Sequence, residues 1–479
     1  MEVNINSEPF KWAKQNFSNL TTTDIRLNKR IIKIAEAMAN KPGTTLPGLF
    51  GSWKDTKAIY RLLNHDSITP DVIQGDHKEN CKRKISEKGI YLLIEDTSDF
   101  SWSGHQPVNG LGPIGSGASG LQGFLLQSVL AARYRGINDS VEVIGIPSQQ
   151  FHIRRPRPKN ETHKSSFQMK SRERESQLWT HSGNNLGKTP SDIEWVRICD
   201  RGADIYELLL QCKEMQHSFV IRASIDRTLV TEESGVPSGT KLFTAAETGK
   251  KLGEFKIKLR SRKNMPARIA NLTVRARRIC LISPKRPGKQ RGKLPSIYCW
   301  ILNVKEINSK SKDKLEWKLL CSREINNLSD ALECIDQYKY RWLIEEYHKA
   351  IKTGLGAEKL QLESAHALFA AISIMSIVAL RLIDLREKVK EQENNMHNNE
   401  IVSELEVKIL EIKTGKKIKT YRELLFAVGQ LGGFLGRKGD GTPGMITLWR
   451  GMNTLRLLAE GYSLLNKVTH LTQQRKVSS

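Results

Sequence analysis

The sequence has no long apolar run and no recognisable export signal. A membrane-spanning helix needs roughly 18 consecutive apolar residues, and the longest candidate, residues 367–380, is shorter and leads directly into Arg381. Residues 1–14 have neither the basic start nor the apolar stretch of a secretory signal. We therefore expect no membrane insertion and no export, and we predict a cytoplasmic protein.

Cysteine pairs and nucleotide-binding motifs are also lacking. The seven cysteines include no Cys-x-x-Cys pair, so neither a disulfide framework nor a zinc site is indicated, and most should be small core residues. No Gly-x4-Gly-Lys-Ser/Thr motif exists. The Gly-x-Gly-x-x-Gly match at residues 110–115 contains Pro113 and does not directly follow a predicted strand. Neither ATP nor a dinucleotide is therefore indicated as a ligand.

Positive charge is the most abundant feature. Lysine and arginine number 76 against 51 aspartates and glutamates, which gives a net charge of +25. Such an excess, in a chain of 479 residues, is expected for a protein that binds a polyanion such as nucleic acid. The alternative is a basic soluble protein without that partner.

Residues 1–72 are predicted to form a helical domain. Asp24 or the preceding threonine can cap a helix that ends near Asn40, a second helix begins near Ser52, and Thr69 followed by proline begins a third. Several cations lie on these helices: Arg26, Lys29, Arg30, Lys54, Lys57 and Arg61. The pattern favours a domain that binds DNA ends, and the alternative is a bundle with a solvated basic face.

Strands and helices alternate in the next part of the chain. Short apolar strands at 91–95 and 195–199 end at Asp96 and Asp200. Two further strands, at 123–132 and 141–146, and a helix near 171–179 lie between them. This order predicts an α/β core, which we assign to residues 73–215 and 323–392.

Residues 216–322 change character. Segments such as 255–259 and 272–277 alternate apolar and polar residues, as half-buried strands do, and a basic loop at 285–293 lies among them. We predict an antiparallel β insertion. After it, one long helix is expected over 332–353, and residues 393–479 are expected to form a helical C-terminal domain.

A third carboxylate lies within the predicted helix 332–353. At about 100° per residue, one stripe of this helix contains Tyr338, Arg341, Glu345, Lys349 and Lys352. Carboxylates at strand ends, as at Asp96 and Asp200, project into the crevice where α/β sheets hold their sites. The alternative for the stripe is an exposed, ion-paired helix face, since Arg341 and Glu345 have the spacing of a weakly stabilising pair. His348 falls outside the stripe and is predicted to be structural.

Three motifs, in this order, carry a resemblance to a known family. They are Ile94-Glu-Asp96-Thr-Ser, then Cys199-Asp200-Arg-Gly-Ala-Asp-Ile, then Tyr338-x2-Arg341-x3-Glu345-x6-Lys352. The third resembles the tyrosine–arginine–glutamate–lysine signature of insertion-sequence-four family DDE transposases, and the first two resemble that family's aspartate motifs. The similarity is strongest to transposases of the transposon-five, cut-and-paste type and covers nearly the whole chain. The second motif departs from these relatives at Gly202, where they carry an acid.

The resemblance implies a fold and a reaction. The fold is a ribonuclease-H-like, retroviral-integrase-like catalytic core, interrupted by the β insertion and flanked by the helical domains. The reaction is metal-dependent cleavage of transposon ends, hairpin formation, and joining of the 3′ ends to target DNA. Asp96, Asp200 and Glu345 are the implied catalytic residues and ligands of Mg²⁺, for which Mn²⁺ can substitute. Hard carboxylates suit these ions, which can activate the attacking oxygen and stabilise the leaving one.

The resemblance also implies DNA contacts and a partner. The residues expected to bind DNA are Arg26, Arg30, Arg222, Trp317, Tyr338, Arg341, Lys349 and Lys352. Trp317 matches a tryptophan that stacks on a flipped base, although its strand position also fits a core residue. Pairing two double-stranded inverted-repeat ends requires at least a homodimer, for which the C-terminal helix offers an apolar stripe: Leu448, Leu455, Leu458, Tyr462 and Leu465. That stripe could instead pack within the chain.

Two other functions remain compatible with these residues. One is a domesticated, non-catalytic DNA-binding protein, which an intact set of carboxylates argues against. The other is a nuclease of the same fold that cuts DNA without strand transfer.

Overall fold

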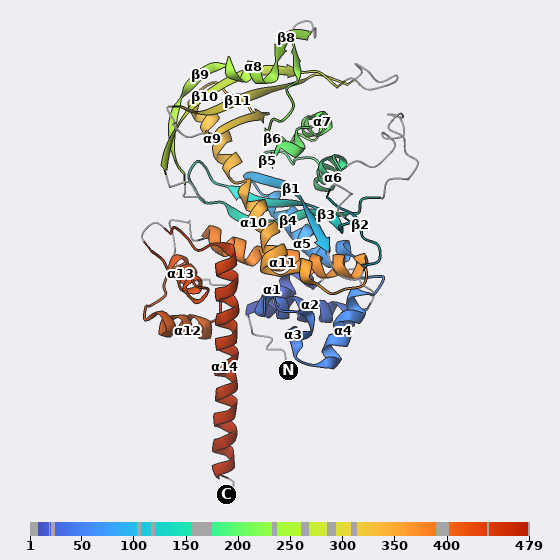
Figure 1. The fold of residues 1–479 in the computed structure, drawn as a ribbon, viewed down its shortest axis with the longest axis vertical. Helices are drawn as coiled ribbons and strands as arrows, with labels where there is room; N and C mark the ends of the chain where they lie inside the picture. Colours follow the sequence, from blue (N-terminus) through green and yellow to red (C-terminus); the bar gives the residue numbers. More distant parts are fainter. Residues whose placement is uncertain are drawn as a thin grey trace.

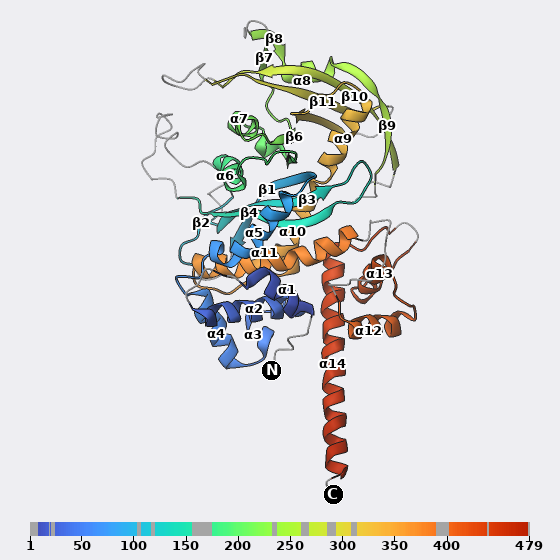
Figure 2. The same ribbon diagram turned by 180° about the vertical axis from the view of Figure 1, so that it is seen from behind.

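The structure, a computed structural model, is a mixed α/β assembly with one large sheet, and the helical N-terminal and C-terminal regions both lie on the same side of that sheet (Figures 1 and 2). It describes residues 8–18, 20, 24–102, 107–115, 120–155, 175–231, 237–259, 268–284, 294–307, 314–388, 402–437 and 440–477. The basic loop at 285–293 lies outside these ranges, as does the start of the helix expected near 171–179; the helix found there, α6, spans Gln177–Leu186.

The N-terminal region consists of five helices. These are α1 (Glu8–Phe17), α2 (Ile25–Asn40), α3 (Leu46–Phe50), α4 (Trp53–Leu63) and α5 (Pro70–Ile85). The predicted caps are confirmed: the side chains of Asp24, Ser52 and Thr69 accept backbone N–H groups at the starts of α2, α4 and α5. Each cap satisfies a donor that the helix itself leaves unpaired. Short local signals therefore determine where these helices begin.

Six strands of the described residues form one half of the sheet. They are β1 (Ile90–Trp102), the short β2 (Gly112–Pro113) paired with β3, β3 (Gln122–Tyr134), β4 (Glu142–His152), β5 (Glu194–Cys199) and β6 (Ser218–Arg222). The spatial order is β4-β3-β1-β5-β6, in which β1, β3 and β4 are antiparallel while β5 and β6 run parallel to β1. Helices α6 and α7 (Tyr206–Glu214) connect β4 to β5 and β5 to β6. This arrangement is consistent with a ribonuclease-H-like core.

The first strand is longer than the sequence indicated. The prediction that it ends at Asp96 is wrong, because β1 continues to Trp102. Its parallel partner β5 stops opposite Glu95, but β3 remains paired with β1 along its whole length. The polar residues 96–99 stay in strand conformation because β3 supplies their backbone partners.

The other half of the sheet is antiparallel. It contains β12 (Glu316–Cys321), β11 (Ile297–Ile307), β10 (Arg268–Leu281), β9 (Lys250–Leu259), β7 (Thr228–Val230) and β8 (Pro237–Lys241), with α8 (Leu242–Glu247) packed on β10 and β11. β12 pairs with β6, so the two halves are continuous. β6 lies within the segment 216–322 but pairs in parallel with β5, so the sheet of the core extends past residue 216.

The long helix expected over 332–353 is interrupted. It consists of α9 (Leu328–Lys339), α10 (Trp342–Lys349) and a π-helical turn, η2 (Ala350–Gly354). Between α9 and α10, the N–H groups of Tyr340 and Arg341 bond to carbonyls only three residues back, at 3.2 and 3.1 Å. Such tight bonds shift the axis of a helix. The prediction that Tyr338, Arg341, Glu345, Lys349 and Lys352 form one stripe on a single helix is therefore wrong.

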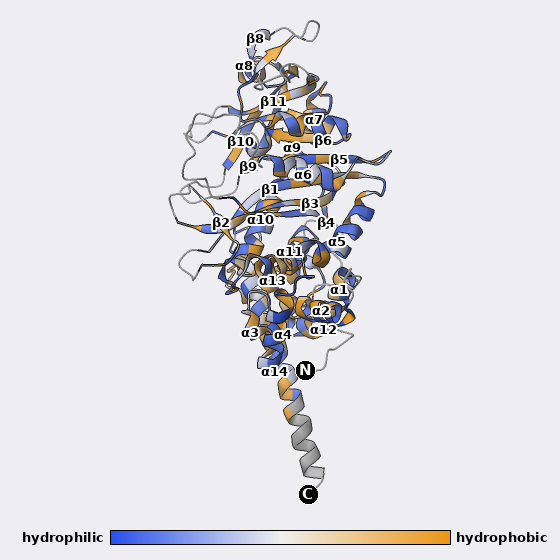
Figure 3. Ribbon diagram, turned by 90° about the vertical axis from the view of Figure 1, so that its right-hand side faces the viewer, coloured by the Kyte–Doolittle hydropathy of each residue, from blue (hydrophilic) through white to orange (hydrophobic). Residues whose placement is uncertain are grey.

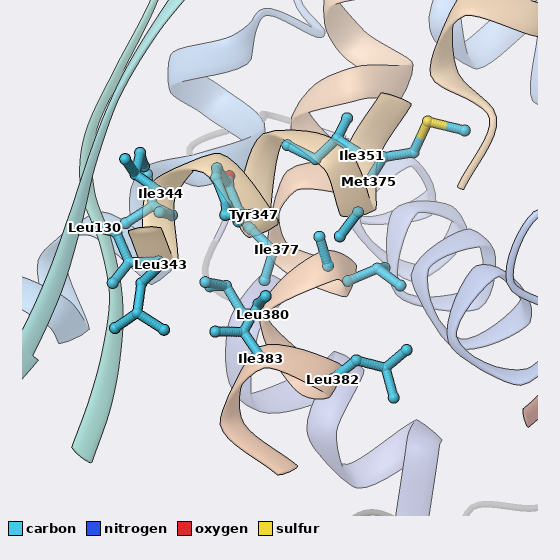
Figure 4. Packing of buried hydrophobic residues seen from close by; sticks show 14 of the residues in the cluster. Leu130, Leu343, Ile344, Tyr347, Ile351, Met375, Ile377, Leu380, Leu382 and Ile383 are labelled. Atoms are coloured by element: carbon cyan, nitrogen blue, oxygen red, sulfur yellow. The ribbon is translucent and has the colours of Figure 1, made fainter. Parts of the chain in front are cut away.

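Helix α11 (Ala365–Lys388) is the centre of the packing. Over Ala365–Asp384 this helix is long and apolar enough to cross a membrane. The sequence had suggested a shorter apolar run, residues 367–380. However, 83% of the apolar window is buried inside the protein. Figure 4 shows its side chains, such as Ile377 and Ile383, packed near Tyr347 of α10. α11 is therefore a core helix that supports the elements carrying the third motif.

The C-terminal region ends in a projecting helix. α12 (Glu404–Thr414) and α13 (Tyr421–Leu431) lie beside α14 (Met445–Val477), whose far end extends away from the body (Figures 1 and 3). The predicted apolar stripe divides in two. Leu448 and Leu455 are buried within the chain, whereas Tyr462 and Leu465 are 48% and 62% exposed.

Candidate active site

Asp96 and Asp200 are brought together by the register of two parallel strands. The last paired residues of β1 and β5 are Glu95 and Cys199, so the two aspartates follow at the same level on neighbouring strands, which lie about 4.8 Å apart. Asp96 accepts the N–H of Thr97 at 2.8 Å, and Asp200 accepts the N–H of Gly202 at 2.8 Å. Both carboxylates are thus held by the backbone at one edge of the parallel pairing.

Glu345 lies on α10, close to these aspartates. Its carboxylate accepts a hydrogen bond from Arg341 at 2.6 Å, the ion pair that the exposed-face interpretation also predicted. Burial, and then the charges of Asp200 and Glu345, raise the pKa of Asp96 to about 6, while Arg341 lowers it. The three carboxylates therefore repel one another within one partly buried region.

The donor set fits a divalent metal in its chemistry. Within the described ranges, no three His, Cys, Asp or Glu side chains lie close enough to hold a metal ion together, and the Glu345 carboxylate is paired with Arg341. Burial is the main cause of the raised pKa of Asp96, and the neighbouring carboxylates of Asp200 and Glu345 add to it. A cation at this position would offset that part of the shift. Oxygen ligands of this kind suit Mg²⁺ or Mn²⁺.

Cations and one phenol surround Asp200. Tyr338, at the end of α9, is only 4% exposed. Burial raises the pKa of Tyr338, and the nearby charges of Arg341 and Arg222 oppose that shift. Arg222 ends β6 and donates to the carbonyl of Glu316 at 3.2 Å. Although the helix is broken, the structure thus gathers three of the residues expected to bind DNA.

Three protein families match consecutive parts of the chain. Residues 9–68 match the family described as Transposase DNA-binding, residues 194–381 match Transposase DDE domain, and residues 378–469 match Transposase Tn5 dimerisation domain. In chain order, these matches cover the helical N-terminal region, the part of the chain that contains Asp200 and Glu345, and the C-terminal helices. The chain belongs to the DDE transposases of the Tn5 type. It is therefore a metal-dependent enzyme that cleaves and transesterifies phosphodiesters, binds DNA and forms a homodimer.

The remaining cations of the third motif lie beside β1 in this transposase. Lys352, on the π turn, forms an ion pair with Asp99 at 3.3 Å, and its ammonium lies 5.0 Å from the centre of the Phe100 ring. Lys349 is exposed on α10. In the N-terminal region, Arg26 pairs with its own cap Asp24 at 3.1 Å, and Arg30 is exposed.

Trp317 is half-buried on β12. Its ring meets that of Tyr338 edge-on, with the centroids 5.9 Å apart. The neighbouring Glu316 and Lys318 line a pocket of about 340 Å³ together with Arg222. Alternation along the strand places Trp317 on the opposite face from that pocket. One edge of Trp317 packs in the protein, as the core interpretation expects, and another part remains accessible to solvent. The stacking role stays a prediction.

A buried ion pair beneath the site was missed from the sequence. Glu95 and Arg197 are both fully buried and face each other across β1 and β5, with Arg197 Nη2 donating to Glu95 at 2.8 Å. Arg197 also donates to the carbonyl of Trp179 at 2.9 Å. The available signal was a single charge in each of the predicted apolar strands, 91–95 and 195–199. His348, as predicted, is structural: it is buried, lies 3.1 Å from the Ser128 hydroxyl, and burial lowers its pKa to about 3.

Proposed function

We propose that this transposase works by cut and paste. It binds inverted-repeat ends, hydrolyses one strand to free a 3′-hydroxyl, uses that hydroxyl to form a hairpin on the opposite strand, and joins the reopened ends to target DNA. The observation that supports this most directly is the juxtaposition of Asp96 and Asp200, with Glu345 and Arg341 beside them, in a chain that also has DNA-binding and dimerisation regions. We propose that it acts in the cytoplasm, associated with DNA.

The chemistry assigns roles to the side chains. Asp96, Asp200 and Glu345 would hold Mg²⁺, or Mn²⁺ in its place, and the metal would supply Lewis acidity to the attacking and leaving oxygens. Arg341 and Arg222 bind phosphate, and Arg341 can do so with two parallel N–H groups. Tyr338, Lys349 and Lys352 add further phosphate contacts, while Arg26 and Arg30 contact the end DNA. The exposed half of the α14 stripe, including Tyr462 and Leu465, contributes to the dimer.

A stepwise assay with labelled end duplex tests this proposal. With Mg²⁺ we expect a nick, then a hairpin, then joined product on a target plasmid, and none of these with a chelator or a scrambled duplex. Nicking without hairpin or joined product would favour the nuclease of the same fold. Sequence-specific binding without cleavage would favour the non-catalytic alternative.

Arg341 and Lys352 allow a test of phosphate binding. Each neutralised phosphate contact contributes to the fall of affinity with salt, so Arg341→Ala and Lys352→Ala should each lower the salt slope by about one contact or less. Arg341→Lys should restore the slope but only part of the cleavage, because a point charge cannot replace a planar guanidinium.

The matched control for this series is Lys88→Ala. Lys88 is exposed just before the start of β1, whereas Asp96 lies in the middle of that strand. It should leave the slope unchanged. If Arg341→Ala and Lys352→Ala behave like the control and cleave normally, the ion pairs of these residues are structural.

Trp317→Ala should separate hairpin formation from nicking. A hairpin forces a sharp bend, and an extruded base that stacks on an indole regains about 1–3 kcal/mol. We expect the variant to bind ends and make the first nick but to form hairpins roughly tenfold more slowly. An abasic nucleotide at the flipped position should partly restore the rate, because it has no stacking to lose.

Trp300→Ala is the control for lost packing. Trp300 is a half-buried tryptophan on the adjacent strand β11 and contacts the same core. It should reduce stability without a defect confined to the hairpin step. Normal hairpin formation by Trp317→Ala, or equal defects in both tryptophan variants, would contradict the stacking role.

A further inference from the structure

The segment between β6 and β7 has no regular secondary structure. It covers residues 223–227 and directly follows Arg222, the last residue of β6. Ser224 and Asp226 are exposed, and Ile225 is 48% exposed, so apolar packing holds little of this segment in place. Polar contacts of its backbone must therefore fix its path, and with it the end of the strand that carries Arg222.

One buried carboxylate makes several of these contacts. The side chain of Asp204 is fully buried, and its Oδ2 accepts the N–H groups of Ser224 at 2.7 Å and Ile225 at 2.9 Å. Its Oδ1 forms an ion pair with Arg227 at 2.5 Å, and Nη2 of Arg227 donates to the Asp204 carbonyl at 2.6 Å. Asp204 thus holds the segment near both of its ends.

Asp204 also belongs to the turn that begins at the catalytic Asp200. A single 3₁₀ turn, η1 (Arg201–Ala203), separates the two aspartates, and the N–H of Asp204 bonds to the Arg201 carbonyl at 3.3 Å. The Ser224 hydroxyl donates to the same carbonyl at 3.1 Å. β5 and β6 are neighbouring parallel strands (Figure 1), so these bonds tie the turn after one strand to the segment after the other. They fix the backbone next to Arg222 relative to Asp200.

The side chain of Arg222 depends on this backbone for its direction. It is half-buried and donates to the carbonyl of Glu316 at 3.2 Å. It also lines the pocket of about 340 Å³, so one side of it faces open space. An arginine has several rotatable bonds and much conformational freedom to lose. With open space on one side, the reach of its guanidinium is set largely by where its backbone is held.

We propose that Asp204 is a positioning residue for cleavage, which holds the segment after β6 so that the Arg222 guanidinium meets the phosphate next to the metal-binding aspartates. The inference rests on the proposed phosphate contact of Arg222. Asp204 is buried and cannot reach the DNA itself. Displacing a binding group by about 1 Å can slow a reaction roughly a hundredfold, so losing this anchor should reduce the rate of cleavage more than the affinity for ends.

The first experiment replaces Asp204 by asparagine in the full-length chain. The amide oxygen of Asp204→Asn can still accept backbone N–H groups, but its NH₂ group is a donor and cannot pair with the guanidinium of Arg227. Single-turnover nicking of labelled end duplex in Mg²⁺ gives the rate at saturating protein, and a gel-shift titration gives Kd. We expect nicking to slow by roughly tenfold to a hundredfold, while Kd stays within a few-fold of the wild type.

A double variant shows whether Asp204 acts through Arg222. Arg222→Ala alone should slow nicking, because the phosphate contact is gone. Adding Asp204→Asn to it should then have no further effect, since no guanidinium is left to position. A purely structural role for Asp204 predicts instead that the two losses multiply, and that result would overturn the inference.

Glu306→Gln is the control for a lost buried carboxylate. Glu306 on β11 makes the same kinds of contact as Asp204: it accepts the N–H of Leu315 at 3.0 Å and a hydrogen bond from Arg268 Nη2 at 2.9 Å. Both variants should lower the midpoint of chemical denaturation, but only Asp204→Asn should slow nicking. Equal slowing in both would show that reduced stability, and not the position of Arg222, limits cleavage.

The remaining outcomes separate this inference from the function beneath it. If the wild type does not nick its ends, the proposed function is wrong and the inference falls with it. If the wild type nicks and Asp204→Asn nicks at the same rate, or if Arg222→Ala nicks normally, only the positioning role is wrong.

Should Asp204→Asn fail to fold, Arg227→Gln takes its place. It removes the charge of the partner and leaves Asp204 its two backbone donors. It should slow nicking in the same way, and this effect should again disappear in the Arg222→Ala background. A normal rate in Arg227→Gln, or a loss that multiplies with that of Arg222→Ala, would contradict the positioning role.

Discussion

Replacing Asp96, Asp200 or Glu345 by alanine is expected to abolish strand cleavage while binding of end DNA survives. A bound metal contributes several kcal/mol of charge stabilisation in the transition state, so losing one ligand should slow nicking by roughly a thousandfold or more. Binding depends mainly on the many cations of a chain whose net charge is +25, and removing one acid does not weaken it. The measurement is single-turnover nicking of labelled end duplex in Mg²⁺, alongside a gel-shift titration.

Glu346→Ala provides the matched control. Glu346 is adjacent to Glu345 on α10 but points away from the aspartates and pairs with Arg386 at 3.0 Å. Cleavage by this variant should stay within a few-fold of the wild type, because its carboxylate is not near Asp96 or Asp200. Substantial Mg²⁺-dependent nicking by any of the three catalytic variants would show that the assigned residue is not required.

Local signals predicted the elements well, and long-range pairing explains what they missed. The caps at Asp24, Ser52 and Thr69 act within one helical turn, so the sequence around each contains the whole interaction. The extension of β1 beyond Asp96 depends on pairing with β3, where the partners of residues 96–102 are residues 122–128, far from them in the sequence. The break between α9 and α10 depends on backbone bonds that helical periodicity does not encode.

The site was predicted to a similar extent and for similar reasons. The predicted strand ends at Asp96 and Asp200 indicated neighbouring positions. β1 in fact continues past Asp96, but its parallel register with β5 still brings the two residues to the same level. The helical wheel grouped Tyr338 with Glu345, but Tyr338 approaches Asp200 from the end of a separate helix. The pairing of Glu345 with Arg341 within the site is a side-chain orientation that the pattern of residue types does not determine.

The buried pair of Glu95 and Arg197 leads to the second large expected effect. Arg197→Ala should destabilise the folded protein by about 3–5 kcal/mol, because removing one partner leaves the other charge buried without compensation. Burial raises the pKa of Glu95 even beside the guanidinium, and loss of Arg197 should raise that pKa further, because the charge that opposes the shift is gone. Chemical denaturation monitored by circular dichroism measures the loss. Lys251→Ala, which breaks the exposed pair with Glu254, should cost less than about 1 kcal/mol.

The double variant Glu95→Leu with Arg197→Met separates the pair's effect on stability from its effect on the site. Apolar residues of similar volume remove both desolvated charges, so most of the lost stability should return. Recovery should be incomplete, because the Trp179 carbonyl that Arg197 satisfies is left without that donor, at a cost of about 1–3 kcal/mol. Glu95 directly precedes Asp96, so we expect the refolded double variant to cleave more slowly than the wild type while binding ends normally.

If Arg197→Ala is as stable as the wild type, the ion pair between Glu95 and Arg197 does not contribute to the stability of the folded protein. If the double variant is no more stable than Arg197→Ala, the cost lies in lost packing rather than in an unpaired charge.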